Sequence, residues 1–271
     1  MDKRYLKLPD TPITASFKYG ALSQNHFYLW MYVLLLAAAE LVTVYIDPIY
    51  GIICHAILLL GLLIQAALTF QKKVNALYLS LTLLPLIRMM SLSMPLDRTP
   101  PLYCYLAISI PLFAAAFLVV RLAGYKREDI SLNWGKIPVQ MAVSLLGIPL
   151  GFIEYQFLKP NPLITEITMR QIWLPVLIMM ISTGFLEELI FCGMLLKAAE
   201  EVMGFVRAVF YASAFFAVLH IIHRSAVDLL FVLAVAFLFS LIVKITRSIM
   251  GVSLAHGLTN IGLYLIWPFL C

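Results

Sequence analysis

Charged residues are scarce in this chain. They make up 12% of the 271 residues, whereas 63% are apolar and the mean hydropathy is +0.97. A soluble domain is about one quarter charged and about half apolar. The shortage of charge therefore excludes a water-soluble domain as the main structure. The formal net charge of +5 indicates contact with an anionic membrane surface, and we expect no nucleic-acid partner.

Cysteine pairs and processing signals are also lacking. The four cysteines, Cys54, Cys104, Cys192 and Cys271, show no paired spacing, which argues against a disulfide framework or a zinc knuckle. The segment 1–24 has basic residues but no short apolar core before a small-residue cleavage site, so we expect no signal peptide.

Long apolar runs fill the chain instead. Each is about 20 residues long, enough to cross a hydrocarbon core of about 30 Å as a helix. The fold class that we predict is all-α, a polytopic transmembrane helical bundle of about nine spans, with eight as the alternative because Pro85 and Arg88 interrupt the third run. The expected spans are 27–46, 49–70, 74–94, 101–122, 137–155, 171–195, 204–223, 226–243 and 248–267.

We interpret residues 1–271 as a single membrane domain, with 1–165 as accessory helices and 166–271 as the part that bears the chemical motifs. Most of the 19 lysines and arginines lie at the N-terminus, for example Lys3, Arg4 and Lys7, or in the even-numbered loops. The excess of basic residues predicts a cytoplasmic N-terminus. The protein would lie in the plasma membrane of a prokaryote or in the endoplasmic reticulum membrane of a eukaryote.

Ionisable residues inside apolar runs are the informative ones, because each costs about 2.5 to 3.5 kcal/mol on insertion scales. Glu40, His55, Arg88 and Glu154 occur singly in the first five runs. For each of them we favour a structural role, as an interhelical hydrogen bond or a side chain that reaches the membrane surface.

Two adjacent carboxylates, Glu187 and Glu188, lie inside the sixth run. Neighbours on a helix point about 100° apart, so only one of them can face a given cavity. We therefore expect the two glutamates to have different partners and different roles.

Two further pairs follow at a spacing of four residues. Phe216 precedes His220 in the seventh run, and His256 precedes Asn260 in the last run. Residues four apart share a helix face, so an aromatic wall would accompany one imidazole and a carboxamide the other. A lone histidine on an apolar helix is usually a packed side chain, but three such elements on separate helices favour a functional site.

The three elements in this order resemble the family of type II CAAX prenyl endopeptidases and their prokaryotic homologues, also called the Abi or self-immunity family, which includes bacteriocin-processing enzymes. The resemblance covers about 183–260, from the paired glutamates and the glycine at Gly193 to His256 and Asn260. It implies an intramembrane endopeptidase that hydrolyses a peptide bond near the C-terminus of a peptide substrate, prenylated in the eukaryotic branch.

The resemblance also implies roles for residues. Glu187 and His220 would activate a water molecule, since a carboxylate can orient an imidazole and raise its basicity. His256 and Asn260 would donate hydrogen bonds to the tetrahedral oxyanion. Glu188, Cys192 and Phe216 would support them.

One position departs from the family pattern. Relatives usually carry an arginine four residues after the second glutamate, where an i, i+4 ion pair can form, and this chain has Cys192 there. Glu188 therefore needs another solution, such as protonation or a charge from another helix. Loss of activity is the further alternative.

The water-activating pair also sets a condition on geometry. If the helix with Glu187 extends to about Glu200 and the next begins near Arg207, the carboxylate and His220 lie at a similar depth. A separation of more than about 10 Å between Glu187 and His220 would contradict a shared water molecule.

Three alternatives stay open at this point. A zinc-dependent version would use Glu187, His220 and His256 as ligands, although we expect no cofactor. A non-catalytic transporter would use the buried charges as a proton relay. A catalytically weakened immunity or scaffold protein would bind a peptide without cutting it. The expected partners are the lipid bilayer and the peptide, and the sequence does not determine an oligomeric state.

Overall fold

The structure is a computed structural model that describes residues 12–95 and 99–271, with side chains from residue 29 onward. The first half contains α1 (Pro12–Tyr45), α2 (Pro48–Leu68), α3 (Lys72–Leu92), α4 (Pro101–Ala123), α5 (Ile137–Ser144) and α6 (Gly147–Leu158). The second half contains α7 (Met169–Ile178), η1 (Met179–Phe185), α8 (Leu186–Glu188), η2 (Leu189–Leu195), α9 (Leu196–Met203), α10 (Phe205–Leu219), η3 (His220–His223), α11 (Ala226–Thr246), α12 (Met250–Ile261), η4 (Gly262–Ile266) and α13 (Trp267–Leu270). The expectations for Lys3, Arg4 and Lys7 lie outside the described residues.

The all-α polytopic fold is confirmed. Seven helical segments of the described residues are long and apolar enough to cross a membrane, and Leu29–Tyr45 is a shorter apolar helix. The third span is unbroken, because α3 continues through Pro85. The last expected span, 248–267, is not among the seven. Its helix α12 carries polar residues that are buried against other helices, such as Ser253, His256 and Thr259.

Two prolines explain local departures from regular helices. The fifth span is divided into α5 and α6, because Pro149 has no N–H to donate to the carbonyl of Leu145. Near the end of the chain, Pro268 leaves the carbonyl of Tyr264 without its helical donor, and this oxygen accepts instead from the backbone N–H of Leu163 at 3.1 Å. The segment after α6 is thereby fastened to η4.

The sixth span is a continuous helix of 35 residues, Met169–Met203. It contains two π-helical segments, η1 and η2, on either side of the short α-helical turn α8 with Glu187 and Glu188. Wider turns of this kind occur frequently at functional sites. The helix ends at Gly204, whose φ of +81° is a conformation that favours glycine, and α10 begins directly after it.

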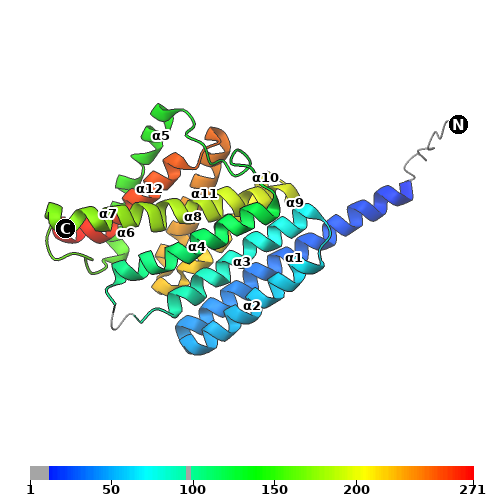
Figure 1. Cartoon of the computed structure of the whole chain (residues 1–271), viewed down its shortest axis with the longest axis horizontal. Helices are drawn as coiled ribbons and strands as arrows, with labels where there is room; N and C mark the ends of the chain where they lie inside the picture. Colours follow the sequence, from blue (N-terminus) through cyan, green and yellow to red (C-terminus); the bar gives the residue numbers. More distant parts are fainter. Residues whose placement is uncertain (1–11, 96–98) are drawn as a thin grey trace.

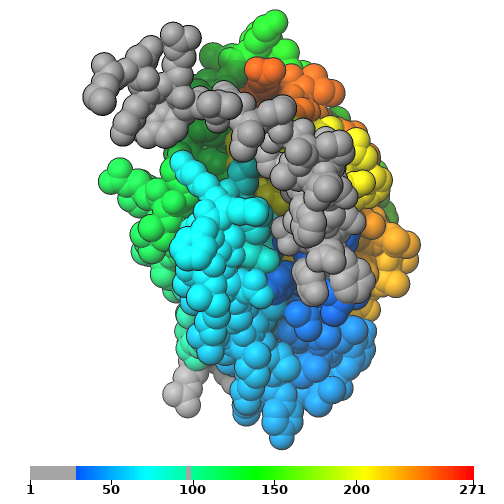
Figure 2. All heavy atoms as spheres, turned by 90° about the vertical axis from the view of Figure 1, so that its right-hand side faces the viewer, coloured from blue at the N-terminus to red at the C-terminus, as the bar shows by residue number. Residues whose placement is uncertain are grey.

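Helices α1, α2 and α3 lie side by side at one edge of the molecule, whereas α5 and α12 lie at the other (Figure 1). Figure 2 shows the first edge, with α2 and α3 in blue to cyan. The long sixth helix passes through the middle, where η1 packs on α12 and η2 packs on α3 and α10. The paired glutamates are therefore near the centre of the bundle.

A buried ion pair joins the first helices to the centre. The Nε of Arg88 on α3 donates to Oε1 of Glu40 on α1 at 2.7 Å, and both side chains are almost fully buried. His55 on α2 places its Nε2 3.5 Å from the same oxygen. A second Arg88 nitrogen donates to the carbonyl of Leu219, next to His220. Three of the four residues that occur singly in the first five runs thus form a cluster between three helices, in line with the structural role expected for them.

We expect Arg88→Met to lower the free energy of unfolding by about 3 to 5 kcal/mol, because it leaves the Glu40 carboxylate buried without its cation. Reversible unfolding in mixed micelles measures the loss. Lys244→Met is the matched control, since Lys244 pairs with Glu200 at a more exposed position and should cost less than about 1 kcal/mol. Similar losses in the two variants would contradict the importance of the buried pair.

Candidate active site

The two adjacent glutamates face different surroundings. Glu188 is 2% exposed and points toward α12, whereas the side chain of Glu187 is 31% exposed and lines a cavity. The two side chains point in different directions because neighbouring residues on a helix are about 100° apart. One carboxylate is thus held in the packed interior and the other is available to a ligand.

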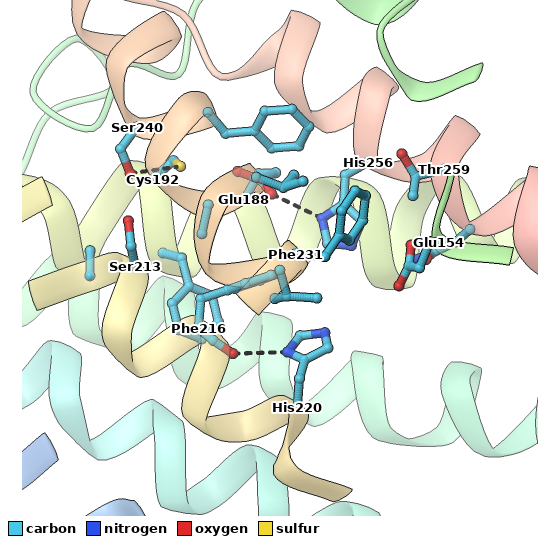
Figure 3. A pocket seen from close by; sticks show the side chains of 17 residues that line it. Glu154, Glu188, Cys192, Ser213, Phe216, His220, Phe231, Ser240, His256 and Thr259 are labelled. Atoms are coloured by element: carbon cyan, nitrogen blue, oxygen red, sulfur yellow. Dashed lines mark hydrogen bonds and ion pairs between the residues drawn. The ribbon is translucent and has the colours of Figure 1, made fainter. Parts of the chain in front are cut away.

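His256 on α12 lies between the two carboxylates. Its Nδ1 is 2.9 Å from Oε1 of Glu188, and its Nε2 is 3.9 Å from Oε2 of Glu187. Figure 3 shows Glu188 and His256 pointing toward each other. A carboxylate oxygen accepts, so the Nδ1 proton is the one donated to Glu188, while Nε2 faces Glu187 beyond hydrogen-bond distance.

The position of His256 depends on close contact between two helix backbones. A Cβ atom built on Gly184 of η1 would lie 2.5 Å from the carbonyl oxygen of Ser253 and 2.8 Å from the nitrogen of Gly257, both on α12. A Cβ on Gly257 would in turn collide with Met180. Only glycine permits this approach, which brings the glutamates within reach of His256.

His220 comes from a third element, the end of α10. Its Nδ1 is 2.8 Å from the carbonyl oxygen of Phe216, one helical turn earlier. Because a carbonyl oxygen only accepts, Nδ1 carries the proton, and the neutral ring keeps its lone pair on Nε2. The spacing Phe-x-x-x-His therefore places a carbonyl against Nδ1 of His220, which leaves Nε2 as the basic nitrogen of the ring.

Phe216 forms the aromatic wall expected from that spacing. Its ring centre is 4.8 Å from that of His220 and 5.7 Å from that of His256, the second contact edge-to-face. Phe191 on η2 packs against it in a further edge-to-face contact at 4.8 Å. Contacts of this kind favour a fixed ring orientation, so Phe216 separates and orients the two imidazoles.

Asn260 on α12 is hydrogen-bonded to the helix that carries the two glutamates. Its Nδ2 donates to Oγ1 of Thr183 at 2.9 Å, and Thr183 donates to the carbonyl of Met179 at 2.6 Å. A carboxamide nitrogen has two protons, so one N–H of Asn260 remains for another acceptor. Its side chain borders the same cavity as Glu187.

The expected site residues meet at one cavity with a volume of about 510 Å³. Glu187, His220, His256, Asn260 and Phe216 all line it. Within the part of the chain that the structure describes, Glu187 forms an ion-pair contact with His256 and none with His220. The two members of the expected water-activating pair thus share a cavity without touching directly.

A second, smaller cavity of about 40 Å³ lies behind Glu188 (Figure 3). Cys192 lines it and places its sulfur 3.9 Å from Oγ of Ser240. Oε2 of Glu188 and Oγ of Ser213 border the same space without a hydrogen-bond partner among the described residues. Cys192 therefore borders a small polar space, and Glu188 takes His256 from another helix as its partner.

The cavities are lined by further ionisable residues that the sequence did not assign to the site: Glu154, for which we expected a structural role, and His223. Glu154 on α6 is buried and borders both cavities. His223 also lines the larger cavity, and its Nδ1 is 2.7 Å from Oδ2 of Asp228. The spacing of three between His220 and His223 is a signal for a shared face. No such spacing connects Glu154 to the other residues.

No group of three or more histidine, cysteine, aspartate or glutamate side chains in the described residues is arranged to hold a metal ion. The contacts present are hydrogen bonds and ion pairs.

We expect Gly184→Ala to lower the melting temperature and any catalytic rate together, because the added Cβ must push η1 away from α12. The cost of such overpacking is about 1 to 3 kcal/mol. Thermal unfolding of the purified variants measures it. Gly61→Ala is the matched control, since a Cβ at Gly61 meets nothing within 4 Å and alanine is the better helix former. A Gly184 variant as stable as the Gly61 variant would contradict the close contact.

The chain was compared with known protein families, curated proteins and solved structures. Residues 169–262 match the model of the family described as type II CAAX prenyl endopeptidase Rce1-like. No curated protein and no solved structure matched the chain. The matched segment contains both glutamates, both oriented histidines and Asn260. The resemblance expected from these residues is therefore confirmed over 169–262, a segment of an all-α membrane protein that is similar to the type II CAAX prenyl endopeptidases.

Proposed function

We propose that this protein is an intramembrane endopeptidase that hydrolyses a peptide bond near the C-terminus of its substrate. The observation that carries the proposal is the cavity of about 510 Å³, which Glu187, His220, His256 and Asn260 all line. These residues come from three separated segments inside the matched region. We further propose that 166–271 is the catalytic part, that 1–165 contributes accessory helices and that the N-terminus is cytoplasmic.

Activation of water is assigned to Glu187 and His220. The carboxylate of Glu187 is accessible from the cavity, and His220 has its Nδ1 bound to the backbone, so Nε2 is the nitrogen free to accept a proton. A water molecule between the two groups would lose its proton as it attacks the peptide carbonyl. General base catalysis of this kind contributes about 10² to 10⁴ in rate.

Stabilisation of the oxyanion is assigned to His256 and Asn260. The remaining N–H of Asn260 and the Nε2 side of His256 both belong to the cavity wall. Because Glu188 holds the Nδ1 side of His256 at 2.9 Å, the ring keeps a fixed orientation during the reaction. Donors fixed in advance are worth about 10² to 10³ in kcat each.

The substrate class is supported by the rest of the cavity wall. Apolar side chains line much of it, including Ile108, Leu112, Ile190 and Leu219. Such a wall suits a peptide with an apolar C-terminal part, and a prenyl group adds about 0.8 kcal/mol for each buried methylene. We propose a C-terminal peptide as the substrate, and the assay compares prenylated and unprenylated forms.

We expect Glu187→Gln and His220→Ala to lower kcat at least about 10²-fold. Asn260→Ala should also lower kcat, and it should change KM less than kcat. The measurement is cleavage of a fluorescent C-terminal peptide by purified protein in lipid nanodiscs. Binding of the peptide without cleavage by the unaltered protein would favour the scaffold function instead.

Unchanged turnover in Glu187→Gln or His220→Ala would contradict the assignment of the water-activating pair. The same assay is repeated after dialysis against a chelator. Activity that is lost on dialysis and restored by zinc alone would replace the proposed mechanism by the metal-dependent one.

A further inference from the structure

Two imidazoles of one short turn border the larger cavity. His220 and His223 both belong to η3, and their ring centres are 5.3 Å apart with the rings perpendicular. The Nδ1 of His220 is bound to a backbone carbonyl, whereas the Nδ1 of His223 is bound to the carboxylate of Asp228. In each ring, Nε2 has no hydrogen-bond partner among the described residues.

The buried carboxylate of Asp228 contacts Nδ1 of His223 and fixes the position of its ring. Its side chain is 0% exposed, and it lies in the first turn of α11, where its backbone N–H donates to Oγ of Ser225 at 3.2 Å. The oxygen Oδ2 contacts His223 at 2.7 Å, while Oδ1 has no partner in the described part of the chain. Because a carboxylate accepts from Nδ1–H, proton exchange on His223 is confined to Nε2.

Peptide hydrolysis needs a second proton transfer besides the one from water to Glu187 and His220. The leaving nitrogen must gain a proton as the C–N bond breaks, because an amide anion is too basic to depart. That proton comes either from the pair that accepted the first one or from a separate general acid at the cavity. His223 is 28% exposed in its side chain and has an Nε2 defined by Asp228.

We infer that His223 is the general acid that protonates the leaving nitrogen and that Asp228 is its positioning residue, an inference that rests on the proposed endopeptidase function. Water gives a proton to the Glu187 and His220 pair while its oxygen bonds to the peptide carbon. The C–N bond then breaks with its electron pair on nitrogen. The imidazolium of His223, whose Nδ1–H stays on Asp228, transfers its Nε2 proton to that nitrogen and becomes neutral. The proton held by the pair returns to His223, so one water molecule is added across the bond.

A pH profile would not isolate this step. Glu154, Glu187, His220 and His256 line the same cavity as His223, and Asp228 contacts it directly. A change of leaving group separates the acid from the base, because a 4-nitrophenolate departs without being protonated.

The experiment compares two substrates in nanodiscs, a C-terminal peptide and a 4-nitrophenyl ester of the same acyl segment. We expect His223→Gln and Asp228→Asn to lower kcat for the peptide at least about 10²-fold and to change ester hydrolysis by less than about threefold. His220→Ala should lower both reactions. Retained ester hydrolysis also shows that each variant has folded.

Ser225→Ala is the matched control, because it removes the side-chain cap at the same end of α11 and leaves the imidazole in place. It should affect the two substrates equally. Equal losses on both substrates in His223→Gln, or full peptide cleavage by that variant, would overturn the role of His223. Neither result would contradict the proposed endopeptidase function. Failure of the unaltered protein to cleave any peptide would instead refute the proposed function, and this inference with it.

Discussion

The close contact between η1 and α12 is the constraint on which the rest of the site depends. Lipid supplies no hydrophobic force between helices, so small residues that let backbones approach are a main source of packing energy in membranes. Gly184 and Gly257 provide this approach between η1 and α12. On the opposite side of α12, a Cβ on Gly151 of α6 would lie 2.6 Å from the carbonyl oxygen of Thr259. Helix α12 is therefore fixed on two sides, and His256 is fixed with it.

Three buried carboxylates inside the bundle each have a separate nitrogen partner. Glu40 is paired with Arg88, Glu188 with His256, and Asp228 with His223. Buried ions are costly unless paired, so each pair limits how the helices that carry it can move. Glu187 is different, because its nearest imidazole nitrogen is 3.9 Å away and its side chain is partly exposed. The carboxylate that is left accessible is the one placed at the cavity.

The first helices take part in the site although they lie outside the matched segment. Arg88 on α3 holds the carbonyl of Leu219, and Arg224 donates to the carbonyl of Val44 on α1 at 2.8 Å. These bonds lie just before and just after η3, the turn with His220 and His223. The helices of the N-terminal part therefore hold the chain on both sides of η3 and help to fix the position of the two imidazoles.

The helical membrane fold could be predicted from sequence, because apolar runs are local signals. The four-residue spacings are also local, and they pointed to side chains that the structure brings to one cavity. The partner of Glu188 could not be predicted, because His256 lies 68 residues away and the local position, Cys192, holds no charge. Arg88 and Glu40 are likewise 48 residues apart. Pairings of this kind depend on helix packing, for which a single sequence gives no periodic pattern.

The most direct test of the central claim is an electron cryomicroscopy structure of the protein in a lipid nanodisc, at a resolution that defines side chains. The account predicts His256 between the two glutamates, with its Nδ1 about 2.9 Å from Glu188 and its Nε2 about 3.9 Å from Glu187, and His220 at the same cavity. A map that places His256 away from both glutamates, or Glu187 more than about 10 Å from His220, would contradict it.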